Sequence, residues 1–167
     1  MRRITTLIGA GLVAAATASL IAVGVGGGAE PVPAAQTLTF VERTVPGADV
    51  VADVPPVGGP TSKGDSFMFR NEVLTHTGKK VGIHEARCTY LAVTTEVVGS
   101  RLICDGIYTL AEGTLSSQTA FTFTENPRIS FTVDGGTGAY EGARGSGTLT
   151  YRSPHDPHSD TVIRLLP

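Results

Sequence analysis

The sequence predicts an all-β protein, a closed eight-stranded antiparallel up-and-down β-barrel. Eight segments rich in Thr, Val, Ile, Phe and Tyr alternate apolar and polar residues, as strands with one buried face do. All but one of the links between them have hairpin length, and no helical period runs through residues 37–167. Closing such a sheet into a barrel removes its exposed edge strands.

Each expected strand is a run of β-branched or aromatic residues bounded by turn residues. The first strand ends before Pro46 and Gly47. The third and fourth strands carry the two cysteines, the sixth and seventh flank a glycine-rich stretch, and the last follows Pro157. The expected ranges are 37–45, 66–75, 81–93, 101–110, 114–124, 128–134, 144–152 and 161–166.

The link from Pro46 to Gly64 is too long for a hairpin and is rich in proline and glycine. A loop of this length is usually functional or disordered. Its valines alternate with small or acidic residues, so the segment could lie over a barrel mouth with an apolar underside. Residues 46–64 are therefore expected either to form a lid or to be disordered.

Residues 1–29 have the layout of a secretory signal peptide. Arg2 and Arg3 precede an apolar run to about Val25, and small residues follow at 27–29. An uncleaved membrane anchor is the alternative, because the run approaches the roughly 20 residues that span a bilayer. We expect a signal peptide over 1–29, a disordered leader over 30–36, and a secreted, extracellular barrel domain over 37–167 with no membrane association.

Charge and ligand patterns narrow the function classes. Without Arg2 and Arg3 the chain keeps 11 of its 13 basic residues against 15 acidic ones, a formal charge of −4, which offers no basic face for nucleic acid. His155, Asp156, His158 and Asp160 are close in sequence, but prolines punctuate them, and a solvated turn is expected there. No metal and no cofactor are expected.

Cys88 and Cys104 are the only cysteines of the chain. In an exported protein such a pair indicates one disulfide. A hairpin turning near Glu96 would place them opposite each other on antiparallel strands, within disulfide range. Two free thiols, one of them nucleophilic, are the alternative, although no His or Asp stands at a recognisable spacing.

The stretch from Gly135 to Gly145 holds five glycines in eleven residues and lies between two strand-like segments. A phosphate-binding loop would need a helix start after it, and a strand follows instead. The stretch is therefore interpreted as a connection between barrel strands, with Tyr140 plugging the turn.

That stretch also resembles the strand connection of the allene oxide cyclase and dirigent barrels. The sequence Gly-Asp-Ser-Phe-Met-Phe-Arg-Asn over 64–71, then Lys79-Lys-Val-Gly82 and Cys88, is similar to further motifs of these proteins. The resemblance covers about residues 37–166. It implies a barrel that binds a flexible apolar molecule and steers its cyclisation or coupling. The polar anchor it implies is Asn71, with Cys88 in the same cavity.

Strand alternation extends this reading to the cavity wall. If Asn71 points inward, so do Phe67, Phe69 and Val73. If Cys88 points inward, so do His84, Ala86, Tyr90 and Ala92, and its partner Cys104 carries Leu102 and Tyr108 inward. Such a lining is typical of a small-molecule site, and it is equally that of a filled barrel core.

The first strand departs from the resemblance. Thr39 and Val41 fall where plant allene oxide cyclases carry a Glu and an Asn, and Thr44 falls at the dirigent acid. Glu42 is the only carboxylate on this strand and is displaced from the family position. These departures argue against cyclisation of the jasmonate precursor.

Three functions remain open. The leading hypothesis is an isomerase-like or cyclase-like barrel acting on a small apolar molecule, with Asn71 and Glu42 as catalytic residues and Phe69, Cys88, Tyr90 and Phe121 binding the substrate. The second is a secreted barrel that binds a small molecule without turnover. The third is a filled barrel used as a scaffold. A homo-oligomer is compatible with each of them.

Overall fold

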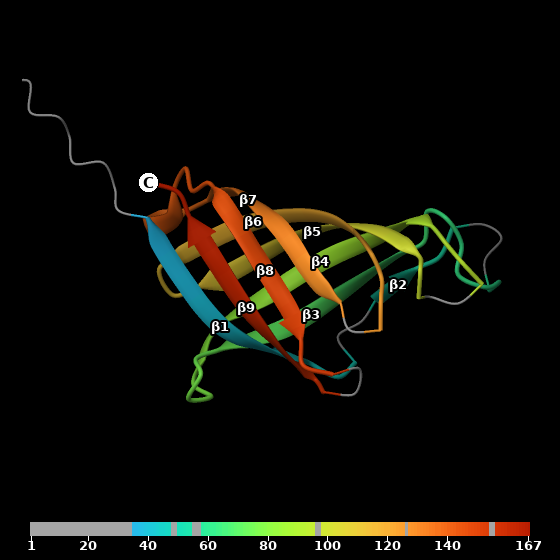
Figure 1. The fold of residues 1–167 in the computed structure, drawn as a ribbon, viewed down its shortest axis with the longest axis horizontal. Helices are drawn as coiled ribbons and strands as arrows, with labels where there is room; N and C mark the ends of the chain where they lie inside the picture. The colour runs from blue at the N-terminus through green and yellow to red at the C-terminus, as the bar shows by residue number, and fades with distance from the viewer. Residues whose placement is uncertain (1–34, 48–49, 55–57, 96–97, 126, 154–155) are drawn as a thin grey trace, which may run out of the picture. The chain divides into compact units, whose positions relative to one another are not determined.

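The computed structural model describes residues 35–47, 50–54, 58–95, 98–125, 127–153 and 156–167. The expected signal peptide and residues 30–34 of the leader lie outside this part of the chain. The described residues hold one antiparallel sheet that closes on itself (Figure 1).

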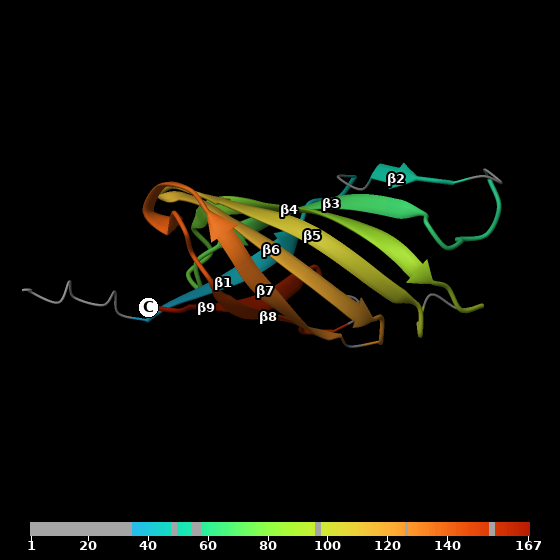
Figure 2. The same ribbon diagram turned by 90° about the horizontal axis from the view of Figure 1, so that it is seen from above.

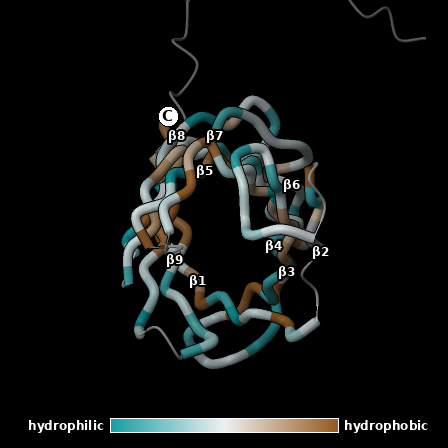
Figure 3. Tube along the Cα trace, turned by 90° about the vertical axis from the view of Figure 1, so that its right-hand side faces the viewer, coloured by the Kyte–Doolittle hydropathy of each residue, from teal (hydrophilic) through white to brown (hydrophobic). Residues whose placement is uncertain are grey.

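The strands are β1 (Gln36–Thr44), β2 (Val50–Ala52), β3 (Ser66–Leu74), β4 (Lys80–Ala92), β5 (Arg101–Leu110), β6 (Gly113–Thr122), β7 (Arg128–Gly136), β8 (Gly145–Tyr151) and β9 (His158–Leu165). Their order in the sheet is β1-β9-β8-β7-β6-β5-β4-β3-β2, and a further pairing of β1 with β3 closes the barrel. The ring of strands, with β1 and β3 side by side, is visible in Figure 3. The predicted closed eight-stranded barrel is confirmed.

The last strand begins earlier than the sequence predicts, at His158 instead of residue 161. Residues 158–160 have weak strand propensity, but they pair with Arg43, Glu42 and Val41 of β1. Pairing with a neighbouring strand outweighs intrinsic propensity at this position.

The long link after β1 contains the short strand β2, which the sequence analysis did not predict. β2 pairs with the part of β3 that β1 has left, from Ser66 to Met68 (Figure 2). Asp65 connects two other points of this link, because its carboxylate accepts hydrogen bonds from the backbone N–H groups of Val54 and Ser62. Residues 48–49 and 55–57 lie outside the described part, and the lid role of this segment stays a prediction.

One end of the barrel is filled by side chains. The glycine-rich stretch forms the end of β7, a 3₁₀ turn η1 (Gly138–Tyr140) and the start of β8, as the sequence predicts. Gly138 has φ +63°, and a Cβ there would lie 2.5 Å from the carbonyl oxygen of Glu112, so only glycine fits. Tyr140 is buried here in a cluster with Val73, Tyr108, Leu115, Phe131, Val133, Leu149, Ile163 and Leu165.

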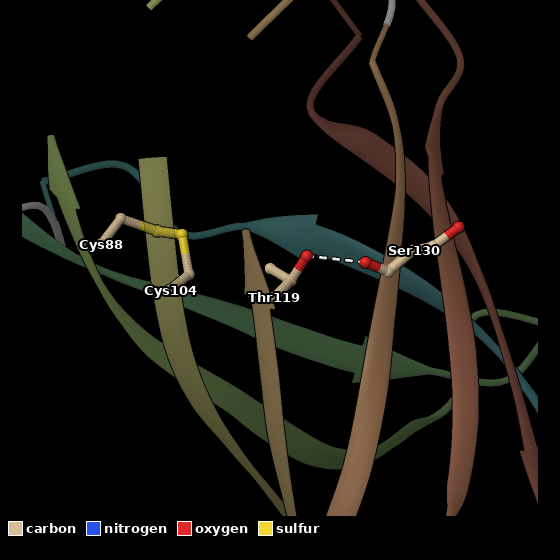
Figure 4. The surroundings of a disulfide bond; sticks show 4 residues. All are labelled: Cys88, Cys104, Thr119 and Ser130. Atoms are coloured by element: carbon tan, nitrogen blue, oxygen red, sulfur yellow. Dashed lines mark hydrogen bonds between the residues drawn. A yellow bond between two sulfur atoms is a disulfide. The ribbon is translucent and has the colours of Figure 1, made fainter. Parts of the chain in front are cut away.

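A second, smaller cluster surrounds the disulfide in the other half of the barrel. Cys88 on β4 and Cys104 on β5 are register partners with Cα atoms 4.1 Å apart, and their sulfurs are bonded (Figure 4). The predicted disulfide is therefore present, and neither cysteine is a free thiol. Buried Leu102 packs with this pair, and the aromatic rings around them are only partly buried: Phe67, Phe69, Tyr90, Phe121 and Phe123. Within the residues described, no helix has the length and apolar character to cross a bilayer.

Candidate functional site

The inward-facing residues of β3 to β6 form successive rows across the barrel. Next to the filled end, the row is Asn71, His84, Tyr108 and Leu115. The next row is Phe69, Ala86, Gly106 and Ser117. Three of these four residues are small, so this row leaves space that large side chains would fill. The disulfide row follows, with Phe67, Cys88, Cys104 and Thr119, and Tyr90, Leu102 and Phe121 lie beyond it.

The barrel interior holds a cavity of about 350 Å³, lined by this row and by residues of the rows on both sides of it. This volume lies within the roughly 300–1,000 Å³ of typical small-molecule sites. Its walls are mostly aromatic and aliphatic, and the polar groups Asn71, His84 and Ser117 lie together at the inner end. The barrel interior is therefore open, and the alternative of a completely filled barrel is wrong.

Glu42 lies behind the inner end of the cavity and is not among its lining residues. Its side chain is 0 % exposed, and both carboxylate oxygens are used. Oε1 accepts hydrogen bonds from Tyr108 Oη at 2.9 Å and Thr161 Oγ1 at 2.7 Å. Oε2 accepts from Asn71 Nδ2 at 2.9 Å and pairs with His84 Nδ1 at 2.8 Å. A buried carboxylate with four partners on four other strands is fully satisfied.

The environment of Glu42 keeps this carboxyl ionised. Burial alone raises its pKa, but the charge of His84 and the hydrogen bonds from His84, Asn71 and Thr161 outweigh this and bring the pKa to about 2. Burial, followed by the nearby Glu42 charge, raises the pKa of Tyr108 well above its usual range. Tyr108 therefore keeps its proton and donates it to Glu42 in a hydrogen bond.

Ionised Glu42 also fixes which ring nitrogen of His84 faces it with a proton. A carboxylate only accepts, so His84 Nδ1 carries the proton, and in the neutral imidazole Nε2 is then an acceptor. The ring is held between two aromatic neighbours, stacked on Tyr108 at 4.0 Å between ring centroids and edge-on to Phe69 at 5.5 Å. A carboxylate-oriented imidazole that borders a cavity can transfer a proton to or from a bound molecule.

The side walls hold polar groups that are already engaged. β6 and β7 pair only from Leu115 to Gln118 on the β6 side. Beyond this point the hydroxyl of Thr119 donates to the carbonyl oxygen of Ser130 at 2.6 Å and joins the two strands (Figure 4). Ser117 donates to the carbonyl oxygen of Gly106 at 3.3 Å.

The structure brings most of the sequence-predicted site residues together. Asn71, Phe69, Cys88, Tyr90 and Phe121 all line the cavity. The sixth, the Glu42 carboxylate, contacts Asn71 but does not line the cavity. β1 turns the Glu42 side chain into the barrel, with Thr44, two residues on, in the cavity wall.

Sequence analysis missed the roles of four residues. His84 and Tyr108 were expected to face inward but were not assigned a chemical part, and Gly106 and Thr161 were not expected in the site. Only the alternation of β4 and β5 pointed to His84 and Tyr108. In the part of the chain that the structure describes, no group of three or more His, Cys, Asp or Glu residues could hold a metal ion.

Comparison with known proteins gives similarity in structure only. No protein-family model matches the chain, and no curated protein sequence matches it significantly. Among solved structures, a pyocyanin demethylase has a TM-score of 0.63 at 22 % identity, over 78 % of this chain and 100 % of its own. The pterocarpan synthase dirigent protein GePTS1 has a TM-score of 0.62 at 19 % identity, over 79 % and 87 % of the two chains.

The Diels–Alderase AbmU from Streptomyces koyangensis has a TM-score of 0.55 at 13 % identity, over 79 % of this chain and 69 % of its own. At these identities the likeness establishes the fold. The chain thus has the allene oxide cyclase/dirigent-like barrel fold that its sequence resembles, and proteins of this fold include cyclases and dirigent proteins.

Proposed function

We propose that this protein is a cyclase-like barrel that binds a small apolar substrate and steers its cyclisation or its stereochemistry. The observation that supports this proposal is the cavity of about 350 Å³, with apolar walls and one polar end. The fold is shared with proteins named as Diels–Alderase and dirigent protein, which favours this class of reaction over others.

The apolar wall would supply most of the catalysis by position. Holding a flexible substrate in one reactive conformer, away from water, removes entropy from the barrier and selects one face for bond formation. The rings of Phe69, Tyr90 and Phe121 form the wall against which the substrate would fold. Cys88 contributes to the same wall as half of a disulfide and brings no thiol.

The polar end of the cavity would hold the substrate and exchange a proton with it. Asn71 is the anchor, and His84, whose Nε2 borders the cavity, is the group that exchanges a proton with the substrate. Glu42 acts through these two as a positioning residue, because its carboxylate holds Asn71 Nδ2 and His84 Nδ1. Removing its charge should therefore lower kcat with little effect on KM.

Chiral product analysis tests the proposal. The protein without residues 1–29 is incubated with a panel of polyenes, epoxy fatty acids and diene–dienophile pairs, and the rate and enantiomeric excess are compared with buffer alone. We expect faster product formation with one enantiomer in excess. Asn71→Ala and Glu42→Gln should reduce both, whereas Gln118→Ala, on the outer face and hydrogen-bonded to Asp105, should reduce neither.

The same panel separates the enzyme from a binder. Saturable binding of panel members, with products unchanged in rate and stereochemistry, would leave a small-molecule-binding barrel without turnover. No binding of any member would reject both functions. The carboxylate–imidazole pair at the end of the cavity favours the enzyme, because binding an apolar molecule alone needs no such pair.

A further inference from the structure

The inner end of the cavity holds a hydrogen-bond acceptor without a partner. Asn71 is 5 % exposed, and its Oδ1 is the one buried side-chain polar atom in the described residues that makes no hydrogen bond. The orientation of the amide follows from chemistry, since the Glu42 carboxylate only accepts and therefore faces Asn71 Nδ2. The acceptor Oδ1 is thus left unsatisfied.

A second acceptor lies in the same row. His84 is the register partner of Asn71, and its Nδ1 is bonded to Glu42. Nε2, the acceptor of the neutral ring, makes no hydrogen bond within the described part of the chain and is next to Gly106. A Cβ at Gly106 would lie 2.7 Å from His84 Nε2 and 2.9 Å from Ser117 Oγ, so the absence of a side chain keeps this corner open.

We propose that this corner is a pocket for a hydrogen-bond-donating head group, a hydroxyl or N–H, on an otherwise apolar ligand, which donates to Asn71 Oδ1 or His84 Nε2. The inference rests on the proposed function in one respect: the cavity is taken as the binding site. The proposal adds the chemical class of the ligand, and it states that the end of the ligand with the donor group enters the cavity first.

The unpartnered Asn71 Oδ1 selects against ligands without a donor. A wholly apolar ligand in the corner would leave this already buried oxygen without a hydrogen bond, and an unsatisfied buried acceptor costs free energy. An ether oxygen is itself an acceptor and would face the acceptor Asn71 Oδ1. Only a donor satisfies Asn71 Oδ1, and loss of one such bond lowers affinity roughly tenfold.

Matched pairs of ligands test this on the unmodified barrel. The probes are 2-naphthol and 2-methoxynaphthalene, and trans-4-hydroxystilbene and trans-4-methoxystilbene, with dissociation constants measured by calorimetry or ligand fluorescence. Each pair shares its apolar body and differs in the donor. We expect the hydroxyl compound of each pair to bind roughly tenfold more tightly than its ether.

Two variants and a control locate the preference. Asn71→Ala removes one acceptor, and Gly106→Ala places a methyl group against His84 Nε2. Each variant should reduce the ratio of the dissociation constants of ether and hydroxyl compound by roughly threefold or more. Thr119→Val is the matched control, because its hydroxyl lies in the same wall but is committed to Ser130, and it should leave the preference unchanged.

The outcomes distinguish this inference from the function on which it rests. Equal binding of hydroxyl compound and ether by the unmodified barrel would overturn the head-group pocket and leave a cavity for apolar molecules. A preference that Thr119→Val removes and Asn71→Ala keeps would also overturn it. Binding of none of the four probes would reject the proposed small-molecule site itself, and the head-group pocket with it.

Discussion

Replacing Glu42 with glutamine probes the buried network at the end of the cavity. The pKa of this carboxyl falls from its ordinary 4.5 to about 2 in the folded protein. A difference of that size corresponds to about 3 kcal/mol of stability at neutral pH. Glutamine keeps the shape of the side chain but turns an NH₂ group toward one of the donors. The Glu42→Gln variant should therefore lose a similar amount of folding stability.

The stabilisation that ionised Glu42 contributes should decrease as the pH falls. The folded pKa is depressed, so the stabilisation is fully present above about pH 4.5 and is lost as the pH falls through about 2. Roughly 2 of the roughly 3 kcal/mol should be gone by pH 3. The gap in stability between the unmodified protein and Glu42→Gln should narrow accordingly on acidification.

Urea denaturation of both proteins between pH 7 and pH 3 measures this gap. Other carboxylates titrate in the same range, but they are present in both proteins and cancel in the difference. A gap that stays constant over this range would refute an ionised, hydrogen-bonded Glu42. A glutamine variant as stable as the unmodified protein at pH 7 would refute it as well.

Two further predictions concern the same half of the barrel. Tyr108→Phe removes one donor to Glu42 and should lower stability by roughly 1–3 kcal/mol in urea denaturation at pH 7, and no loss would contradict the network. The variant with Cys88→Ser and Cys104→Ser loses a cross-link between residues 16 apart, which should cost roughly 3 kcal/mol. Two alkylatable thiols in the purified protein without reductant would show that the disulfide does not form.

The strands could be predicted because their cause is local. Alternation of apolar and polar residues defines each strand and its inward face, and it correctly placed Asn71, Phe69 and Tyr90 in the wall. The two cysteines also fixed the register of β4 against β5. β2 could not be predicted, because it forms only where β1 leaves the edge of β3 free.

The chemical core of the site could not be predicted from spacing. Glu42 meets Asn71, Tyr108 and Thr161 across separations of 29, 66 and 119 residues, and no sequence pattern links positions so far apart. The open cavity could not be predicted from the sequence either. It depends on Ala86, Gly106 and Ser117 being side by side in one row, which only the registers of two strand pairs, β4–β5 and β5–β6, bring about.

The most direct test of the account is whether the barrel holds one apolar ligand inside it. Thr119→Phe places a ring in the wall of the cavity and should fill it. Calorimetric titration with trans-4-hydroxystilbene should give one site per chain for the unmodified protein and no measurable binding for Thr119→Phe, with both proteins folded by circular dichroism. Equal binding by the two proteins would place the ligand outside the cavity and contradict the account.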